Sequence, residues 1–164
     1  MDALALLRMQ SAGAERQMQQ IMAQVTPDQA VWHLEGSTAN LIITTFLHVY
    51  HAEDRAVNGQ LGKETIFGGG GWQERLGFDP AAQWQPPAQA DVEAGRAYAV
   101  AVQTATRQYL EGLEPSALEQ EIETPRGRQP LVNRLNIYLV THKLMHAGEI
   151  AALLGCQGVK GLPF

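Results

Sequence analysis

Residues 141–150 read Thr-His-Lys-Leu-Met-His-Ala-Gly-Glu-Ile, and the two histidines, His142 and His146, are four positions apart. The surrounding segment, residues 131–154, has the composition and spacing of a helix. On a helix, side chains at positions i and i+4 lie one above the other on the same face. Two imidazoles placed in this way can direct their ring nitrogens at one divalent cation.

The spacing predicts that this pair of histidines faces the interior of the protein. Apolar residues recur along the segment in steps of three and four, and both histidines fall on the same line. The line consists of Leu131, Leu135, Tyr138, His142, Met145 with His146, Glu149 and Leu153. An HxxxH pair is equally compatible with two histidines held by ordinary hydrogen bonds, so a metal site needs support from the rest of the chain.

Length and charge exclude several classes of protein. The 164 residues fit one domain, which we expect to span 1–164, and the hydrophobic fraction of 45% is that of a globular protein. The 12 basic and 17 acidic residues form no basic cluster, so neither nucleic acid nor an anionic membrane is expected as a partner.

The N-terminus does not resemble a signal peptide, and no apolar run is long enough to span a bilayer. A single cysteine, Cys156, excludes an intramolecular disulfide, suits the cytoplasm and is predicted to be an inert, packed thiol.

Four amphipathic segments predict an all-α fold, a four-helix bundle with long crossover connections. We expect the helices at residues 3–24, 38–58 (after an N-cap at Ser37 or Thr38), 91–111 (capped by Asp91) and 131–154, where Gly155 ends the last one. The connection over residues 59–90 contains four consecutive glycines, 68–71, which are not expected inside a helix. A small hairpin is predicted at residues 122–128.

His48 is the predicted third partner of the HxxxH pair. It lies on the second helix, whose first half is apolar on nearly every side, so it should project into the core of the bundle. His51 competes for the same role. His48 is preferred because the charged residues 53–55 should draw the His51 end of the helix toward solvent.

Three histidines predict a catalytic metal site, because they leave coordination positions open for water or substrate. A divalent cation lowers the pKa of bound water and so provides a nucleophile at neutral pH. Glu149, one turn after His146, is the candidate catalytic residue beside the ligands. It either orients a histidine ring by accepting its N–H or is simply a solvated carboxylate.

These residues resemble the DinB-like superfamily of metal-binding four-helix bundles. The resemblance rests on Asn40-Leu41-Ile42, Phe46-Leu47-His48 and Glu53-Asp54, on residues 142–150, on the glycine-rich ending 155–164 and on the segment 72–77. It covers the chain from about residue 40 onward and implies that His48, His142 and His146 bind a divalent metal, zinc or nickel. Members with an assigned activity include S-transferases that use bacillithiol or mycothiol, and a maleylpyruvate isomerase branch. Many members are dimers, so a homodimer is expected.

Two functions follow from these observations. The first is a metal-dependent enzyme that transfers a low-molecular-weight thiol to a small-molecule substrate, or hydrolyses one, with a metal-bound thiolate or water as nucleophile. The second is a non-catalytic, stress-related or binding module that the metal stabilises. The loop 59–90 is the expected lid, and Phe67, Trp72 and Phe78 either line an apolar pocket or attach the loop to the bundle. The substrate and the identity of the metal stay open.

Overall fold

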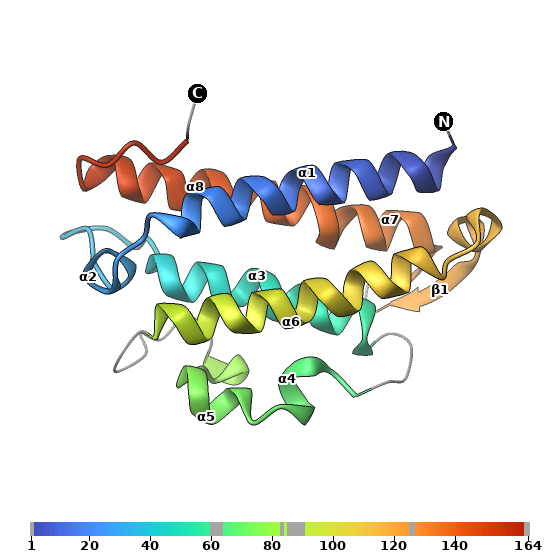
Figure 1. Ribbon diagram of the computed structural model, residues 1–164, viewed down its shortest axis with the longest axis horizontal. Helices are drawn as coiled ribbons and strands as arrows, with labels where there is room; N and C mark the ends of the chain where they lie inside the picture. The colour runs from blue at the N-terminus through green and yellow to red at the C-terminus, as the bar shows by residue number, and fades with distance from the viewer. Residues whose placement is uncertain (1, 60–63, 83, 85–90, 125–126, 163–164) are drawn as a thin grey trace.

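The computed structural model describes residues 2–59, 64–82, 84, 91–124 and 127–162. Four long helical segments lie side by side as two pairs (Figure 1). They are α1 (Ala3–Ala23), α3 (Ile42–Val57), α6 (Val92–Glu111) and a continuous run of α7 (Leu131–Asn136), the π-helical turn η4 (Ile137–Thr141) and α8 (His142–Cys156). Helix α3 packs against both α6 and α8, and α1 packs against α8. The predicted all-α bundle is confirmed.

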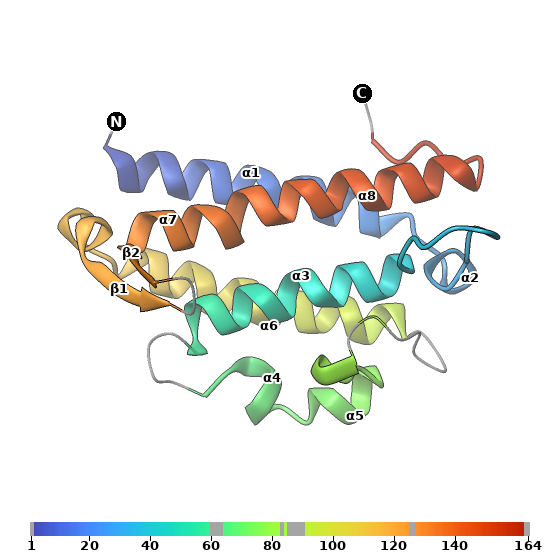
Figure 2. The ribbon, with the colours of Figure 1, turned by 180° about the vertical axis from the view of Figure 1, so that it is seen from behind.

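The direction of the helices explains the long connections. Helices α1 and α8 run one way along the bundle, while α3 and α6 both run the other way (Figures 1 and 2). Two consecutive helices that run in parallel must be joined by a chain that returns along the bundle. The connection between α3 and α6 is therefore the crossover that the sequence predicted.

Helix ends depend on local hydrogen bonds. Asp2 and Asp91 cap α1 and α6 by accepting hydrogen bonds from the amides of Ala5 and Ala94, both at 2.8 Å, as predicted for Asp91. The predicted start of the second helix is wrong, because the Ser37 hydroxyl accepts from the amide of Ala39 in a turn and α3 begins only at Ile42.

The end of the last helix also differs from the prediction. Helix α8 continues through Gly155 to Cys156, and the chain leaves it at Gly158, whose φ is +75°. The amide of Val159 donates to the carbonyl of Leu154 at 2.9 Å and closes the helix. Cys156 is exposed on this last turn, so its predicted burial is wrong.

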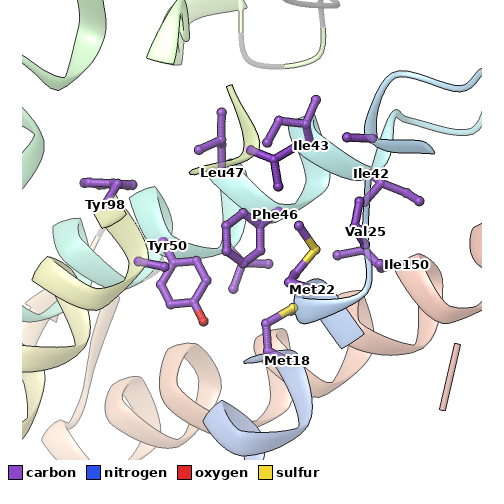
Figure 3. Close-up of a cluster of buried hydrophobic side chains, with 14 of the residues drawn as sticks. Met18, Met22, Val25, Ile42, Ile43, Phe46, Leu47, Tyr50, Tyr98 and Ile150 are labelled. Atoms are coloured by element: carbon purple, nitrogen blue, oxygen red, sulfur yellow. The ribbon is translucent and has the colours of Figure 1, made fainter. Parts of the chain in front are cut away.

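The core lies between the two helix pairs (Figure 3). Met18 and Met22 from α1 face Phe46 and Tyr50 from α3, and Ile150 from α8 closes the cluster. The predicted buried face of α1 is confirmed over its length. It consists of Leu7, Ala14, Met18, Ile21, Met22 and, just after the helix, Val25. Helix α3 is buried on nearly every side, as its apolar sequence predicted.

The connections contain short elements. Thr26 and Gln29 form a capping box for α2 (Pro27–Ala30). The predicted hairpin is present as β1 (Glu121–Thr124) antiparallel to β2 (Gly127–Pro130). After α6 comes the 3-10 helix η3 (Pro115–Glu119).

The crossover contains α4 (Ile66–Gly69), α5 (Trp72–Leu76) and the 3-10 turn η2 (Pro80–Ala82). Gly68 and Gly69 are thus helical, contrary to expectation, because the Thr65 hydroxyl caps this single turn by accepting from the amide of Gly68. Within the described part of the chain, no helix is both long and apolar enough to cross a bilayer.

Candidate metal centre

The π-helical turn η4 sets the position of the two histidines on α8. A π turn takes more residues than an α turn, so residues four apart stay in line across it. The buried line along the last helix therefore consists of Leu131, Leu135, Leu139, Lys143, Ala147, Ile150 and Leu154. The predicted line through Tyr138 and His142 is wrong. His142 and His146 are half-buried and lie at the edge of the observed buried line, and Met145 is 63% exposed.

The edge position brings the histidine pair next to His48 of α3, which is also half-buried. The Nε2 atoms of His48 and His142 are 3.1 Å apart, and those of His142 and His146 are 3.2 Å apart. One ring nitrogen from each of the three residues lies within 4.8 Å of the others. The predicted convergence of three imidazoles from the second and fourth helices is therefore present.

The distances fit one shared cation. Two nitrogens each about 2.05 Å from a tetrahedral zinc ion lie about 3.3 Å from each other. The two measured separations are close to that value. The chemistry of the donors fits as well, because neutral imidazoles suit zinc and nickel.

Glu149 orients the ring of His146. Its Oε2 lies 2.7 Å from Nδ1 of His146. A carboxylate can only accept, so Nδ1–H donates, and the lone pair of the neutral ring is on Nε2, which faces the cluster. This arrangement matches the carboxylate–histidine pairs that accompany metal sites. Whether Glu149 takes part in a reaction stays a prediction.

His142 is also held neutral. Burial, and after it the neighbouring His146, His48 and Lys143, together lower the pKa of His142 to about 4. Its Nδ1 is buried and has no hydrogen-bond partner among the residues that the structure describes. His142 therefore lacks the orienting acceptor that His146 has.

His51 lies outside the cluster. It is 9% exposed and packs edge-on against Phe67 and Phe78, with ring centres 5.1 and 5.8 Å away. Burial lowers its pKa, and Arg55 lowers it further. The preference for His48 agrees with the geometry, but its stated reason was wrong, because Glu53 and Asp54 are fully buried and do not draw this helix toward solvent.

A buried ionic network, which the sequence analysis missed, lies directly behind the histidines. The Lys143 ammonium is fully buried, 2.6 Å from Oε2 of Glu15 and 2.7 Å from Oε2 of Glu53. Tyr50 donates to Glu15, and Gln103 and Thr106 donate to Glu53. Burial alone would lower the pKa of Lys143, but the two carboxylates outweigh it and raise the pKa. In the sequence, this network is indicated only by the position of Lys143, which falls on the series of every fourth residue that starts at Leu131.

Asp54 attaches the crossover to the bundle. Its carboxylate accepts from the amides of Ile66 and Phe67, at 3.0 and 2.9 Å, and from the hydroxyl of Tyr98 at 3.2 Å. Phe67, Trp72 and Phe78 are all buried in the core. Of the two alternatives for these aromatics, the structure shows attachment to the bundle.

Within the described part of the crossover, Trp84 packs against the histidine cluster. Its ring centre lies 4.5 Å from that of His48, and it is 45% exposed. The remaining residues expected in a lid, 60–63, 83 and 85–90, lie outside the described part. His33, on the loop before α3, is exposed and is not part of the cluster.

A cleft of about 860 Å³ opens beside the cluster. Its walls come from α3, from the last helical segment and from the hairpin. His48 and His142 lie on this wall, so a small molecule in the cleft would contact them directly.

A helical bundle that places three imidazoles on two facing helices, beside an open cleft, has the features of a metal-binding bundle protein. The chain belongs to the DinB superfamily, whose family model matches residues 10–150, a range that includes all three histidines.

A crystal structure of a protein from Enterococcus faecalis, described as the conserved protein of locus, is similar to this chain with a TM-score of 0.77. The two are 15% identical, and the match covers 93% of this chain and 95% of that one. At that identity the likeness shows the fold alone. No curated protein matches the sequence significantly.

Proposed function

We propose that this protein is a metal-dependent enzyme in which His48, His142 and His146 hold a divalent cation, zinc or nickel, for thiol transfer to a small molecule or for hydrolysis. The observation that carries the proposal is the convergence of three Nε2 atoms beside an open cleft, which His48 and His142 line. A bound divalent cation lowers the pKa of water or a thiol and so supplies a nucleophile at neutral pH.

The chain's own residues prepare the site. Glu149 holds the His146 ring in the tautomer that directs Nε2 at the cluster. Burial keeps His142 neutral and able to ligate. The ring of Trp84 packs against the ring of His48. Around the three Nε2 atoms, no Cys, Asp or Glu of the described residues completes the ligand set. This leaves room for an exogenous ligand.

Metal analysis is the first test. Purified wild-type protein should contain zinc or nickel equimolar to the chain, and the His48→Ala, His142→Ala and His146→Ala variants should each lose most of it. The exposed His33→Ala is the matched control and should keep the metal. Equal metal content in the His48 and His33 variants would contradict the site.

A second candidate function is a structural role for the same ion. The three ligands come from α3 and α8, so an ion at this point would cross-link two helices of the core. X-ray absorption spectroscopy with and without a small thiol separates the two functions. In an enzyme of the proposed kind, a sulfur joins the three imidazole nitrogens, and the protein accelerates transfer of the thiol to a chloronitrobenzene electrophile. In a structural site the coordination shell stays unchanged, and the main effect of His48→Ala is a lower melting temperature.

A further inference from the structure

The charge of the cleft points to the kind of molecule that it binds. Arg55 and Arg134 line the cleft, and none of the described residues that line it is Asp or Glu. The chain as a whole has a net charge of −5, and the residues outside the described ranges include no Asp or Glu side chain. A positively charged cleft in an acidic protein selects anions.

The two arginines lie at the same end of the cleft. Arg55 follows His48 on α3 by two helical turns, and Arg134 precedes His142 on the last helical segment by two turns. Figure 2 shows that these two helices run in opposite directions. A residue two turns after His48 on one helix and a residue two turns before His142 on the other therefore lie on the same side of the histidine cluster. Two turns correspond to about 11 Å along a helix. The cleft therefore has a cationic end and a histidine end about that far apart.

Both arginines are available for a ligand, unlike several others in the protein. Arg8 and Arg96 donate to backbone carbonyls, and Arg128 pairs with Glu123. Neither Arg55 nor Arg134 forms an ion pair within the described part of the chain.

Arg134 carries an unsatisfied donor. Its guanidinium lies 5.0 Å from the centre of the Tyr138 ring, and its Nε is buried with no hydrogen-bond partner among the described residues. A buried N–H of a charged group without a partner costs free energy, so the described residues alone do not satisfy this guanidinium.

The wall between the two ends is largely apolar. Tyr138 lies between Arg134 and His142, with its ring centre 5.9 Å from that of His142. The exposed Ile137 adds to this wall, and the exposed Met145 extends the apolar surface beyond His142. An aromatic and aliphatic wall suits the hydrocarbon part of a ligand.

We propose that the cleft binds an elongated organic carboxylate. The carboxylate pairs with Arg55 and Arg134, the hydrocarbon body lies against Tyr138, and the opposite end meets the histidine cluster. The contact of that opposite end with the histidine cluster rests on the proposed function, whereas the binding of the carboxylate by the two arginines does not.

A matched pair of thiols tests the inference on zinc-loaded protein. The dissociation constants of 6-mercaptohexanoate and 6-mercaptohexanol, measured by calorimetry, compare a carboxylate with a hydroxyl on the same chain. The acid should bind at least about 10-fold more tightly, the effect of one charge-assisted hydrogen bond. Arg55→Met and Arg134→Met should each remove most of this preference with zinc content unchanged. Arg16→Met, which removes an exposed arginine on α1, should preserve it.

Equal affinities of the acid and the alcohol for the wild-type protein, or a preference that survives in the double Arg55→Met, Arg134→Met variant, would overturn the proposal. A second arm uses the protein as purified with hexanoate and hexanol, followed through the NMR signal of the Arg134 Nε–H. Hexanoate should shift that signal and hexanol should not. The absence of a shift overturns the carboxylate site even if the cluster binds zinc, and a shift upholds it even if zinc is absent.

Discussion

Replacement of Lys143 by Met would test whether the ionic network behind the histidines supports the fold. The side chain is fully buried, and its ammonium lies 2.6 and 2.7 Å from two buried carboxylates, those of Glu15 and Glu53. The change leaves both carboxylates without a cation, and breaking a buried ion pair on one side costs about 3 to 5 kcal/mol. The donors from Tyr50, Gln103 and Thr106 remain, so the lower end of this range is expected.

The loss corresponds to a fall in melting temperature of about 6 to 20 °C for a domain of this size. Thermal and urea unfolding of metal-free protein measure it, because a bound ion would add its own stabilisation. The exposed Lys160→Met is the matched control and should cost less than about 0.5 kcal/mol.

The network also predicts a rescue and a pH dependence. The variant with Lys143→Met, Glu15→Gln and Glu53→Gln removes all three charges and should recover most of the lost stability. Burial already raises the pKa of Glu53 while Lys143 lowers it, so the pKa rises further without Lys143. As the pH falls, the folded Lys143→Met variant takes up a proton before its unfolded chain does. The difference in free energy of unfolding between this variant and the wild type should therefore become smaller at lower pH. The role assigned to the network would be refuted if the free energy of unfolding of Lys143→Met were less than about 1 kcal/mol below that of the wild type. A triple variant no more stable than the single one would refute it as well.

Three further predictions address the histidines and the crossover. Glu149→Gln should weaken zinc binding about 10- to 100-fold in a chelator competition, because the amide no longer fixes the His146 tautomer; unchanged affinity would mean that the contact is incidental. The free energy of unfolding of metal-free protein should fall as the pH drops from about 6.5 toward 4, because the unfolded chain protonates His142 while its folded pKa is about 4. His142→Gln should flatten this dependence in urea titrations, and the exposed His33→Gln should not. Asp54→Asn should cost roughly 3 kcal/mol by replacing a charged acceptor of the Ile66 and Phe67 amides, and should speed limited proteolysis of the crossover; a wild-type cleavage rate would argue against this anchor.

The class of fold and the identity of the cluster were readable from the sequence because both depend on short-range patterns. Apolar spacing on a helix is determined by 3.6 residues per turn, so the buried face of α1 followed directly from its residues. The separation of His142 and His146 likewise places them on one helix face whatever surrounds them. His48 was predicted from its place on the apolar second helix, and the resemblance to a known superfamily supported it over His51.

Only the tertiary structure decided which residues of these helices are buried and what they contact. The π turn η4 moves the buried line from Tyr138 and His142 to Leu139 and Lys143, and a single-residue shift of this kind leaves no periodic signal. Lys143 can be buried because carboxylates far away in the chain, at Glu15 and Glu53, neutralise it. A charged residue is solvated or buried according to partners that folding brings together. The sequence alone therefore determined the helices and the histidine pair, and the structure decided the ionic network behind them and the cleft in front.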